Sequence, residues 1–208
     1  MQCPLCNSTA AYFNTYNTRI YNRCTSCASV FLDTRDLPDA QDEKQRYDLH
    51  ENNFQNEGYI KFLSPLINAV LDNEKPSAMG LDFGSGPNPV LSNILKQKGY
   101  SIAQYDIFYA DEIKNLHKKY DFIICCEVIE HFHNPANEFK RLKSLLKASG
   151  RLYCKTKLLD KTIDFKMWSY KNDFTHSFFY TRLALKQIKK SLGFSELIIH
   201  QDFFTLKA

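Results

Sequence analysis

The sequence predicts an α/β fold in which a mostly parallel sheet ends in an antiparallel hairpin and is preceded by a small N-terminal ribbon. Three observations support this prediction. From residue 79 onward, short apolar runs alternate with segments of helical periodicity, as in strand–helix–strand units. Two strand-like segments joined by a very tight connection close the chain. Near the other end, four cysteines form two CxxC pairs.

The first strand of the sheet is predicted at residues 79–83, where it breaks into the glycine turn LDFGSGP. Gly84 and Gly86 lack a Cβ, so the backbone can turn sharply and approach a ligand closely. The run from Val90 to Lys98 has apolar residues at helical spacing, which gives the strand, turn and helix of a nucleotide-type cofactor loop. Pro89 replaces the third glycine of the dinucleotide pattern. A cofactor with a ribose and no pyrophosphate therefore fits best, and a tight turn without a ligand is the alternative.

Two further strands end in polar residues. The second strand, predicted at residues 100–105, leads to Asp106, which lies 20 residues beyond Gly86. A carboxylate at that distance can accept hydrogen bonds from both hydroxyls of a ribose, although a solvated loop acid is the alternative. The third strand, residues 122–126, leads into EVIEHFHNP. Ligands of open α/β sheets bind beyond such strand ends, so this segment is a candidate site.

The rest of the sheet follows from the C-terminal part of the chain. A helix is predicted at residues 136–146, with Glu130 assigned to its start because negative charge is favoured there. A strand is predicted at residues 151–159. Thr181 is a plausible N-cap for a helix that Gly193 stops, and the strands FSELIIHQ and DFFTLKA then form the terminal hairpin.

Taken together, LDFGSGP, Asp106 and CCEVIEHFHNP resemble the signature of class I S-adenosylmethionine-dependent methyltransferases. The resemblance covers roughly residues 58–208 and implies a Rossmann-like sheet with S-adenosylmethionine as cofactor. By position, it implies that Asp82, Gly84 and Gly86 contact the amino-acid part of the cofactor. It further implies that Asp106 binds the ribose and that Glu127 lies beside the methionine and methyl region.

The N-terminal cysteines predict a metal site. Cys3 and Cys6 form one CxxC pair, Cys24 and Cys27 form the other, and seventeen residues separate the pairs. This spacing is typical of a tetrahedral structural zinc ribbon, in which four thiolates leave no open position for catalysis. The first residues contain no apolar core of a secretory signal, so disulfides are a poor alternative and a cytoplasmic location is expected.

The sequence thus divides into a zinc ribbon (1–32), a linker or lid (33–57) and a methyltransferase domain (58–208). In the linker, Tyr47, His50 and Phe54 are spaced for one helix face and could cover the cofactor. A polar surface connector is the alternative. We expect an acceptor pocket formed by Tyr47 and His50, by the segment after residue 126, and by His176 with Phe178.

Methyl transfer depends mainly on orientation and exclusion of water, and a base is needed only when the acceptor must lose a proton. The candidates for that base are Glu127, His131 and His176. His131 could instead cap or pack against the following helix, and His176 could be a structural histidine.

Composition leaves the acceptor open. A net charge of +4 with dispersed basic residues does not by itself indicate nucleic acid, and no apolar run is long enough for a membrane span. The resemblance to methyltransferases implies a small molecule or RNA as the acceptor, and the oligomeric state is not predicted. One rival function is an NAD-dependent oxidoreductase, which Pro89 and the terminal hairpin disfavour. The other is a non-catalytic zinc-ribbon interaction protein, suggested by Asn88 where many methyltransferases have glycine.

Overall fold

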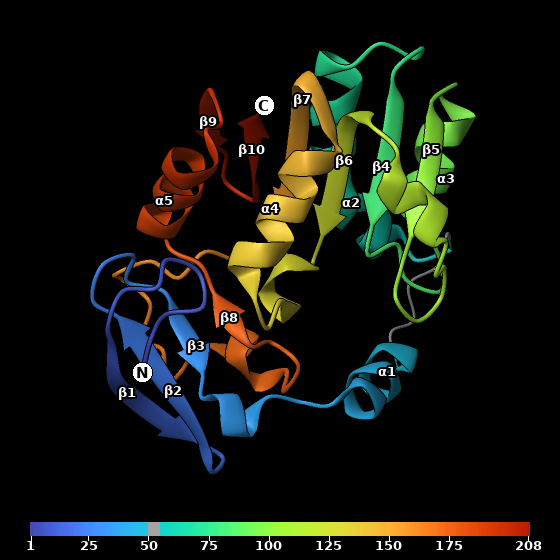
Figure 1. Cartoon of the computed structure of the whole chain (residues 1–208). Coiled ribbons are helices and arrows are strands. Elements are labelled where there is room, and N and C mark those ends of the chain that lie inside the picture. Colours follow the sequence, from blue (N-terminus) through green and yellow to red (C-terminus); the bar gives the residue numbers. More distant parts are fainter. Residues whose placement is uncertain (50–54) are drawn as a thin grey trace.

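The computed structural model describes residues 1–49 and 55–208 and has two sheets (Figure 1). The larger sheet has the strand order β5-β4-β6-β7-β10-β9, and the smaller has the order β1-β2-β3-β8. The larger sheet contains β4 (Met79–Phe83), β5 (Ser101–Tyr105), β6 (Tyr120–Cys126), β7 (Leu146–Lys155), β9 (Glu196–Ile199) and β10 (Phe203–Lys207). The smaller contains β1 (Ala10–Tyr16), β2 (Arg19–Cys24), β3 (Val30–Leu32) and β8 (Phe178–Phe179).

Five α-helices connect these strands in the described part of the chain. They are α1 (Ala40–Asp48), α2 (Glu57–Asn73), α3 (Val90–Gln97), α4 (Pro135–Leu145) and α5 (Arg182–Leu192). As predicted, Thr181 accepts a hydrogen bond at the N-terminus of α5, and Gly193 ends that helix in the left-handed conformation. None of the described helices is both long enough and apolar enough to cross a membrane.

The predicted α/β fold is confirmed. Strands β5, β4, β6 and β7 are parallel, whereas β10 pairs antiparallel with both β7 and β9 to form the terminal hairpin. Within the larger sheet, β4 comes first in the chain yet lies between β5 and β6. The chain therefore passes first to one side of β4 and then crosses to its other side. Such a switch point opens a crevice at the carboxyl ends of the strands, which is where α/β sheets bind ligands.

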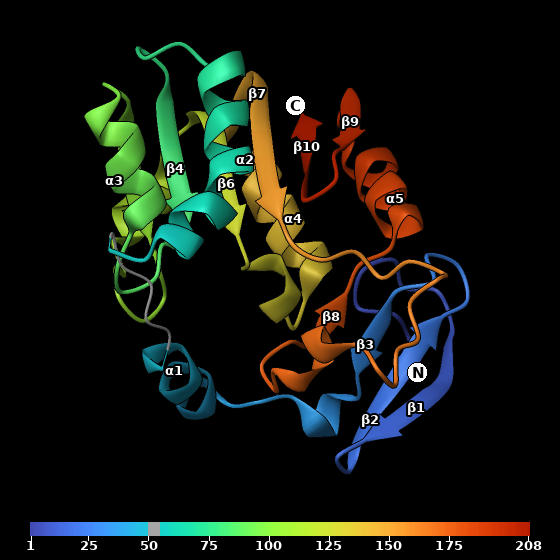
Figure 2. The ribbon, with the colours of Figure 1, turned by 180° about the vertical axis from the view of Figure 1, so that it is seen from behind.

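Both faces of the sheet are buried, because side chains alternate along each strand. In β6, Phe122 and Ile124 belong to the core beneath α2 and α3, whereas Ile123 and Cys125 belong to the core beneath α4 and α5. Figure 1 shows the face that α4 covers, and Figure 2 shows α2 and α3 on the opposite face. This coverage of both faces explains why β6 is a continuous apolar run, as the sequence predicted for a fully buried parallel strand.

One strand differs from the prediction. We expected a strand at residues 151–159, but β7 begins at Leu146 and ends at Lys155. It starts earlier because Leu146 already pairs with Tyr120 of β6, and the register then shifts before Arg151. Ser149, which has a φ of 65°, lies in this irregular stretch. Beyond β7 the chain leaves the sheet, and the Leu159 amide donates to the carbonyl oxygen of Tyr180.

The smaller sheet is completed by a strand from the C-terminal third of the chain. Strand β8 pairs antiparallel with β3, and the rings of Phe31 and Phe178 stack at a centroid distance of 5.8 Å. Our expectation that Phe178 lines the acceptor pocket is therefore wrong, because its ring is buried against the N-terminal sheet. Two residues past β8, the Thr181 hydroxyl donates to the carbonyl oxygen of Cys27 at 2.5 Å.

Candidate active site

A cavity of about 650 Å³ lies at the carboxyl ends of β4, β5 and β6. Its volume falls within the range of roughly 300–1,000 Å³ that is usual for small-molecule sites. Six residues identified from the sequence line it together: Gly84, Gly86, Asp106, Glu127, His131 and His176. The switch point of the sheet and the predicted polar strand ends therefore coincide in one place.

The two glycines of the loop after β4 have different local roles. Both have positive φ angles, 80° at Gly84 and 65° at Gly86. A Cβ on Gly84 would lie 2.4 Å from a methyl group of Val128, whereas a Cβ on Gly86 would meet nothing within 4 Å. Gly84 thus allows close packing of this loop against the segment after β6, and Gly86 leaves its space to the cavity.

Asp106 joins the loops that follow β4 and β5. Its carboxylate accepts hydrogen bonds from the amides of Gly86 (2.8 Å), Phe108 (2.9 Å) and Tyr109 (3.2 Å). The residue is only 8% exposed. A carboxylate has about four acceptor positions, so these three bonds fix its orientation in the cavity wall and leave capacity for a ligand hydroxyl.

Asp82 lies behind the loop. It is 4% exposed, accepts a 2.6 Å hydrogen bond from the Ser92 hydroxyl of α3, and is not one of the residues that line the cavity. Burial is the main cause that raises its pKa to about 6, because the charged form loses its hydration. The side chain therefore connects β4 to α3 beneath the loop.

Glu127, at the end of β6, belongs to a buried cluster with Glu130 and Tyr170. The Tyr170 hydroxyl lies 3.0 Å from Glu127 Oε2 and 2.5 Å from Glu130 Oε1. Burial raises the pKa of both carboxyls, and that of Glu130 lies well above its ordinary value. A phenol has one proton to donate, so the cluster is completed by a proton on a carboxyl or by another cation.

Our assignment of Glu130 to the start of the following helix is wrong. Glu130 is fully buried within a 3₁₀ turn (Ile129–His131). Helix α4 begins only at Pro135, and its N-cap is Asn134. The turn separates Glu130 from the helix start, and its side chain points inward to the Tyr170 hydroxyl. His131 likewise does not supply that cap.

The two histidines of the cavity are oriented by backbone carbonyls. His131 Nδ1 lies 3.1 Å from Thr175 O, and His176 Nδ1 lies 2.6 Å from Tyr170 O. A carbonyl oxygen only accepts, so each Nδ1 carries a proton, and the neutral form of each ring has its lone pair on Nε2. The rings meet edge to face at a centroid distance of 4.9 Å. Two basic nitrogens therefore belong to the same part of the cavity.

Helix α1 covers this part of the cavity. The ring of Tyr47 lies 5.1 Å from that of His131 and 5.8 Å from that of Phe108. The neighbouring Arg46 forms a 2.8 Å ion pair with Asp173, just before His176 in the chain. Tyr47 thus lines the cavity as expected, whereas His50 and Phe54 lie outside the described residues.

Two more contacts hold α1 across the opening. The Tyr109 hydroxyl donates to Asp48 at 2.6 Å, and Glu43 lies 3.0 Å from His133 Nε2. Tyr109 follows β5, whereas His133 follows β6. The helix is therefore attached to both walls of the cavity.

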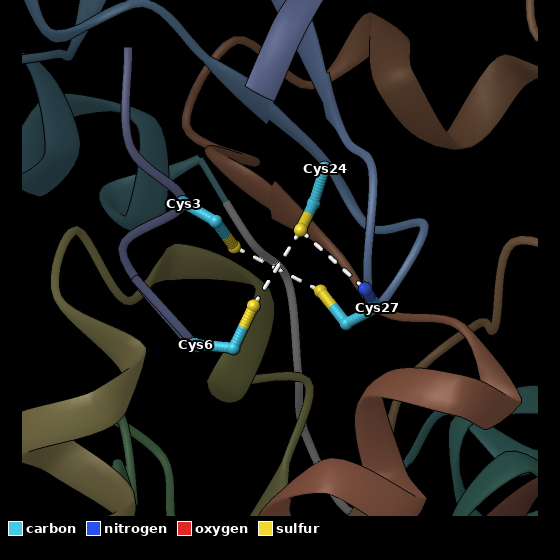
Figure 3. Close-up of side chains that lie close together, drawn as sticks. All are labelled: Cys3, Cys6, Cys24 and Cys27. Carbon is cyan, nitrogen blue, oxygen red and sulfur yellow. Dashed lines mark hydrogen bonds between the residues drawn. The ribbon is translucent and has the colours of Figure 1, made fainter. Parts of the chain in front are cut away.

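The four N-terminal cysteines form a second site at the end of β2, in which Cys24 is the last residue of the strand. Figure 3 shows their sulfur atoms directed toward a common centre. All four atoms lie within 4.8 Å of one another, with 3.8 Å between Cys3 and Cys27 and 3.5 Å between Cys6 and Cys24. A tetrahedral ion with Zn–S bonds of about 2.3 Å separates its sulfurs by about 3.8 Å. The cluster therefore has the dimensions of a four-thiolate zinc site.

The local environment favours a thiolate at Cys27, whereas burial raises the pKa of Cys24. The amides of Ser26 and Cys27 both lie 3.4 Å from the Cys24 sulfur, as donors to it. The hydrogen bond from Cys3 is the main cause that lowers the pKa of Cys27 to about 5. All seven cysteines of the chain are free thiols in the structure.

The sheet order, the glycine loop and the acidic strand ends define a methyltransferase-like α/β protein. A family model described as "Methyltransferase domain" matches residues 54–198. The chain therefore belongs to the S-adenosylmethionine-dependent methyltransferase family. No curated protein sequence matches it.

Solved structures agree with this fold. One is the 1,6-didemethyltoxoflavin-N1-methyltransferase of Burkholderia thailandensis, with bound 1,6-didemethyltoxoflavin and S-adenosylhomocysteine. It matches with a TM-score of 0.57 and 14% identity over 96% of this chain and 98% of that chain. An O-methyltransferase family protein from the same organism has a TM-score of 0.54 and 11% identity over 83% of this chain. CalO1, a methyltransferase of calicheamicin biosynthesis in its S-adenosylhomocysteine-bound form, has a TM-score of 0.51 and 14% identity over 81% of this chain. This chain spans 64% and 57% of the latter two.

Two members of the site, Tyr170 and the inward-facing Glu130, were not predicted from the sequence. The spacing of Glu127 and Glu130 was the available signal, because residues three apart lie on one side of a helical turn. Tyr170 had no such signal, since only the folded chain brings it to the end of β6.

The loop geometry predicts different outcomes for two alanine substitutions. Gly86→Ala should lower the free energy of unfolding by about 1–2 kcal/mol, the cost of a left-handed alanine, and should weaken S-adenosylhomocysteine binding. Gly84→Ala should destabilise the protein more, because its Cβ also overlaps Val128. Urea denaturation and calorimetry measure both effects. Equal stability losses in the two variants would contradict this account of Gly84.

The buried Asp82 predicts a pH effect on stability. Its pKa rises from 3.8 to about 6 on folding, so the native state holds this proton more tightly than the unfolded chain. Stability is then favoured at low pH and lost as the pH rises through that interval. The free energy of unfolding of the parent, relative to that of Asp82→Asn, should fall by up to about 3 kcal/mol between about pH 4 and pH 7. Urea denaturation across this range should show no such difference for the control Asp202→Asn, which alters an exposed carboxyl.

Proposed function

We propose that this protein transfers a methyl group from S-adenosylmethionine to a small-molecule acceptor. The observation that carries the proposal is the convergence of the loops after β4, β5 and β6 on one cavity at the switch point. Membership of the methyltransferase family supports this function over hydride transfer with NAD. The rival of a non-catalytic interaction protein gains no support from a cavity that retains Asp106 and Glu127.

The cofactor would lie across these three loops. We assign the amino-acid part to the backbone at Gly84 and Gly86, and the ribose to the remaining acceptor capacity of Asp106. Glu127 would lie beside the methionine and methyl region. Asp82 would act through its hydrogen bond to Ser92, which holds the loop that the cofactor contacts.

The acceptor would occupy the end of the cavity beneath α1. Glu127, His131 and His176 are there, and the oriented histidines have the lone pair on Nε2 that a base requires. The attacking atom of the acceptor would form a bond to the methyl carbon while the bond from that carbon to sulfur breaks. Sulfur keeps the electron pair, and the acceptor proton passes to the base. Positioning and exclusion of water would supply most of the acceleration.

The attachment of α1 favours a small acceptor over RNA. Ion pairs and hydrogen bonds join this helix to both walls, and Tyr47 lies against His131. A strand of RNA would need these contacts to open, whereas a small molecule fits beneath them. The structural relative solved with 1,6-didemethyltoxoflavin holds a small ligand of this kind.

We further propose a structural zinc ion at Cys3, Cys6, Cys24 and Cys27. The support is the spacing of the four sulfurs, which a tetrahedral ion satisfies with no open position left. The ion would hold the two CxxC turns together and thereby stabilise the smaller sheet. A thiolate site of this type persists in a reducing compartment, so we place the protein in the cytoplasm.

Replacement of Asp106 tests the cofactor site. Asp106→Ala should raise the dissociation constant for S-adenosylhomocysteine at least about tenfold, since charge-assisted hydrogen bonds to the ribose are lost. Calorimetry measures this, and Asp111→Ala, an exposed change in the same loop, is the matched control. Unchanged affinity would remove Asp106 from the site. Tight binding of NAD instead would refute the proposed function.

Metal analysis tests the zinc site. The purified protein should contain one zinc per chain, and Cys24→Ser should lower both the zinc content and the midpoint of thermal unfolding. Cys126→Ser, which changes a thiol outside the cluster, should retain the metal. A parent protein without zinc, or full zinc content in Cys24→Ser, would contradict the assignment.

A further inference from the structure

We propose that Glu130, His131 and His176 form a second metal site, which takes a divalent first-row cation at the acceptor end of the cavity. The site is separate from the four cysteines, because it lies beyond β6 and next to β8 in the main cavity. Three protein ligands would leave coordination positions open for other molecules.

The three donor atoms are close enough for one ion. One nitrogen of each histidine and one oxygen of Glu130 all lie within 4.8 Å of one another. Ligands at about 2.1 Å from a metal are separated by about 3.0–3.4 Å. Small side-chain rotations therefore bring the three atoms to bonding distance. The edge-to-face contact of the two imidazoles already places their rings side by side.

The histidines have the orientation of metal ligands. Each donates Nδ1–H to a backbone carbonyl, so its Nε2 carries the lone pair that can coordinate a metal ion. Such a hydrogen bond behind the ligand is a regular feature of metal-binding histidines, because it fixes the tautomer and increases the basicity of the other nitrogen. Both carbonyls belong to the segment before β8, Tyr170 and Thr175.

Glu130 supplies an independent observation. It is fully buried, and its Oε2 has no hydrogen-bond partner among the residues that the structure describes. A buried carboxylate oxygen without a partner is costly, and a bound cation would satisfy it. Its other oxygen accepts from Tyr170, so the carboxyl is also held in place as a ligand would be.

The ligand set defines the kind of ion. Two imidazoles with one carboxylate suit Mn²⁺, Fe²⁺, Co²⁺ or Zn²⁺, whereas Mg²⁺ and Ca²⁺ prefer oxygen ligands alone. His131 and His176 line the cavity, while Glu130 lies behind them. The open positions would thus face the cavity.

The position of the ion in the cavity also indicates the class of acceptor. This step rests on the proposed function. A cation beside the methyl donor would bind a hydroxyl of the acceptor, orient it and lower its pKa. We therefore expect a hydroxyl-bearing acceptor, methylated on oxygen. Glu127, in the same cavity wall, would then receive the proton that the hydroxyl loses, because the Nε2 atoms of both histidines would be metal ligands.

Titration with Mn²⁺, followed by electron paramagnetic resonance, tests the site in full-length protein from which any zinc beyond one ion per chain has been removed. Mn²⁺ is suitable because it binds N/O/S sites more weakly than zinc and disfavours thiolates, so it leaves the cysteine cluster intact. We expect one Mn²⁺ per chain. The affinity should fall at least about tenfold in Glu130→Gln and His176→Ala. The control His117→Ala, which alters an exposed histidine elsewhere, should match the parent.

Two further measurements separate the possible outcomes. Calorimetry with S-adenosylhomocysteine, together with near-ultraviolet circular dichroism, shows whether each variant is folded; if His176→Ala is not, the near-isosteric Glu130→Gln decides. Absence of stoichiometric Mn²⁺ binding by the parent, or equal affinity in folded Glu130→Gln, would overturn the metal site while leaving the cofactor site untouched. Mn²⁺ binding without S-adenosylhomocysteine binding would instead preserve the metal site and refute the proposed function.

Discussion

The parallel pairing of β4 with both β5 and β6 is the constraint on which the site depends. Phe83 pairs with Tyr105, and Asp82 pairs with both Gln104 and Ile124, so the three strands end at nearly the same level. The residues that follow them must therefore meet above one edge of the sheet. The Asp106 carboxylate then links two of the loops through backbone amides, which helps to fix the wall of the cavity.

The third loop is held by a different kind of interaction. Glu127 and Glu130 place two carboxyls in a buried region, and Tyr170 is hydrogen-bonded to both. Like charges in a medium of low polarity are costly, so burial and the neighbouring Glu127 raise the pKa of Glu130. Because the cluster is buried, the protonation of its carboxyls also depends on any ligand that binds nearby. A stabilising role alone would be served better by apolar side chains of similar size.

The N-terminal sheet contributes to the site indirectly. Strand β8 completes that sheet, and His176 precedes it by two residues, so pairing of β8 with β3 fixes the chain next to the cavity. The hydroxyl of Thr181 adds a bond to the carbonyl of Cys27, one of the four clustered cysteines. The cysteine cluster and the acceptor end of the cavity are thus connected through one short segment. Helix α1 follows the same sheet in the chain (Figure 1), and its residues Glu43 and Tyr47 line the cavity.

Local patterns in the sequence were sufficient to predict one group of features. Apolar runs, glycine positions and caps specify strands, turns and helix ends through short-range sterics and burial, and so β4, α3, β6 and the terminal hairpin could be predicted. Asp106 and Glu127 could be placed in the cavity because strand ends of a parallel sheet share an edge. The paired CxxC spacing was likewise enough to predict that the four N-terminal cysteines form one cluster.

Contacts between segments that are distant in the sequence could not be predicted from it and are determined only by the tertiary structure. Phe178 joined the N-terminal sheet instead of the cavity because β3 offered an open edge with which β8 could pair. Glu130 turned inward because Tyr170, forty residues later, provides its hydrogen bond. The pairing of His131 with His176 required the same folding event. No local pattern encodes such contacts, since their energy is gained only when both segments are already in place.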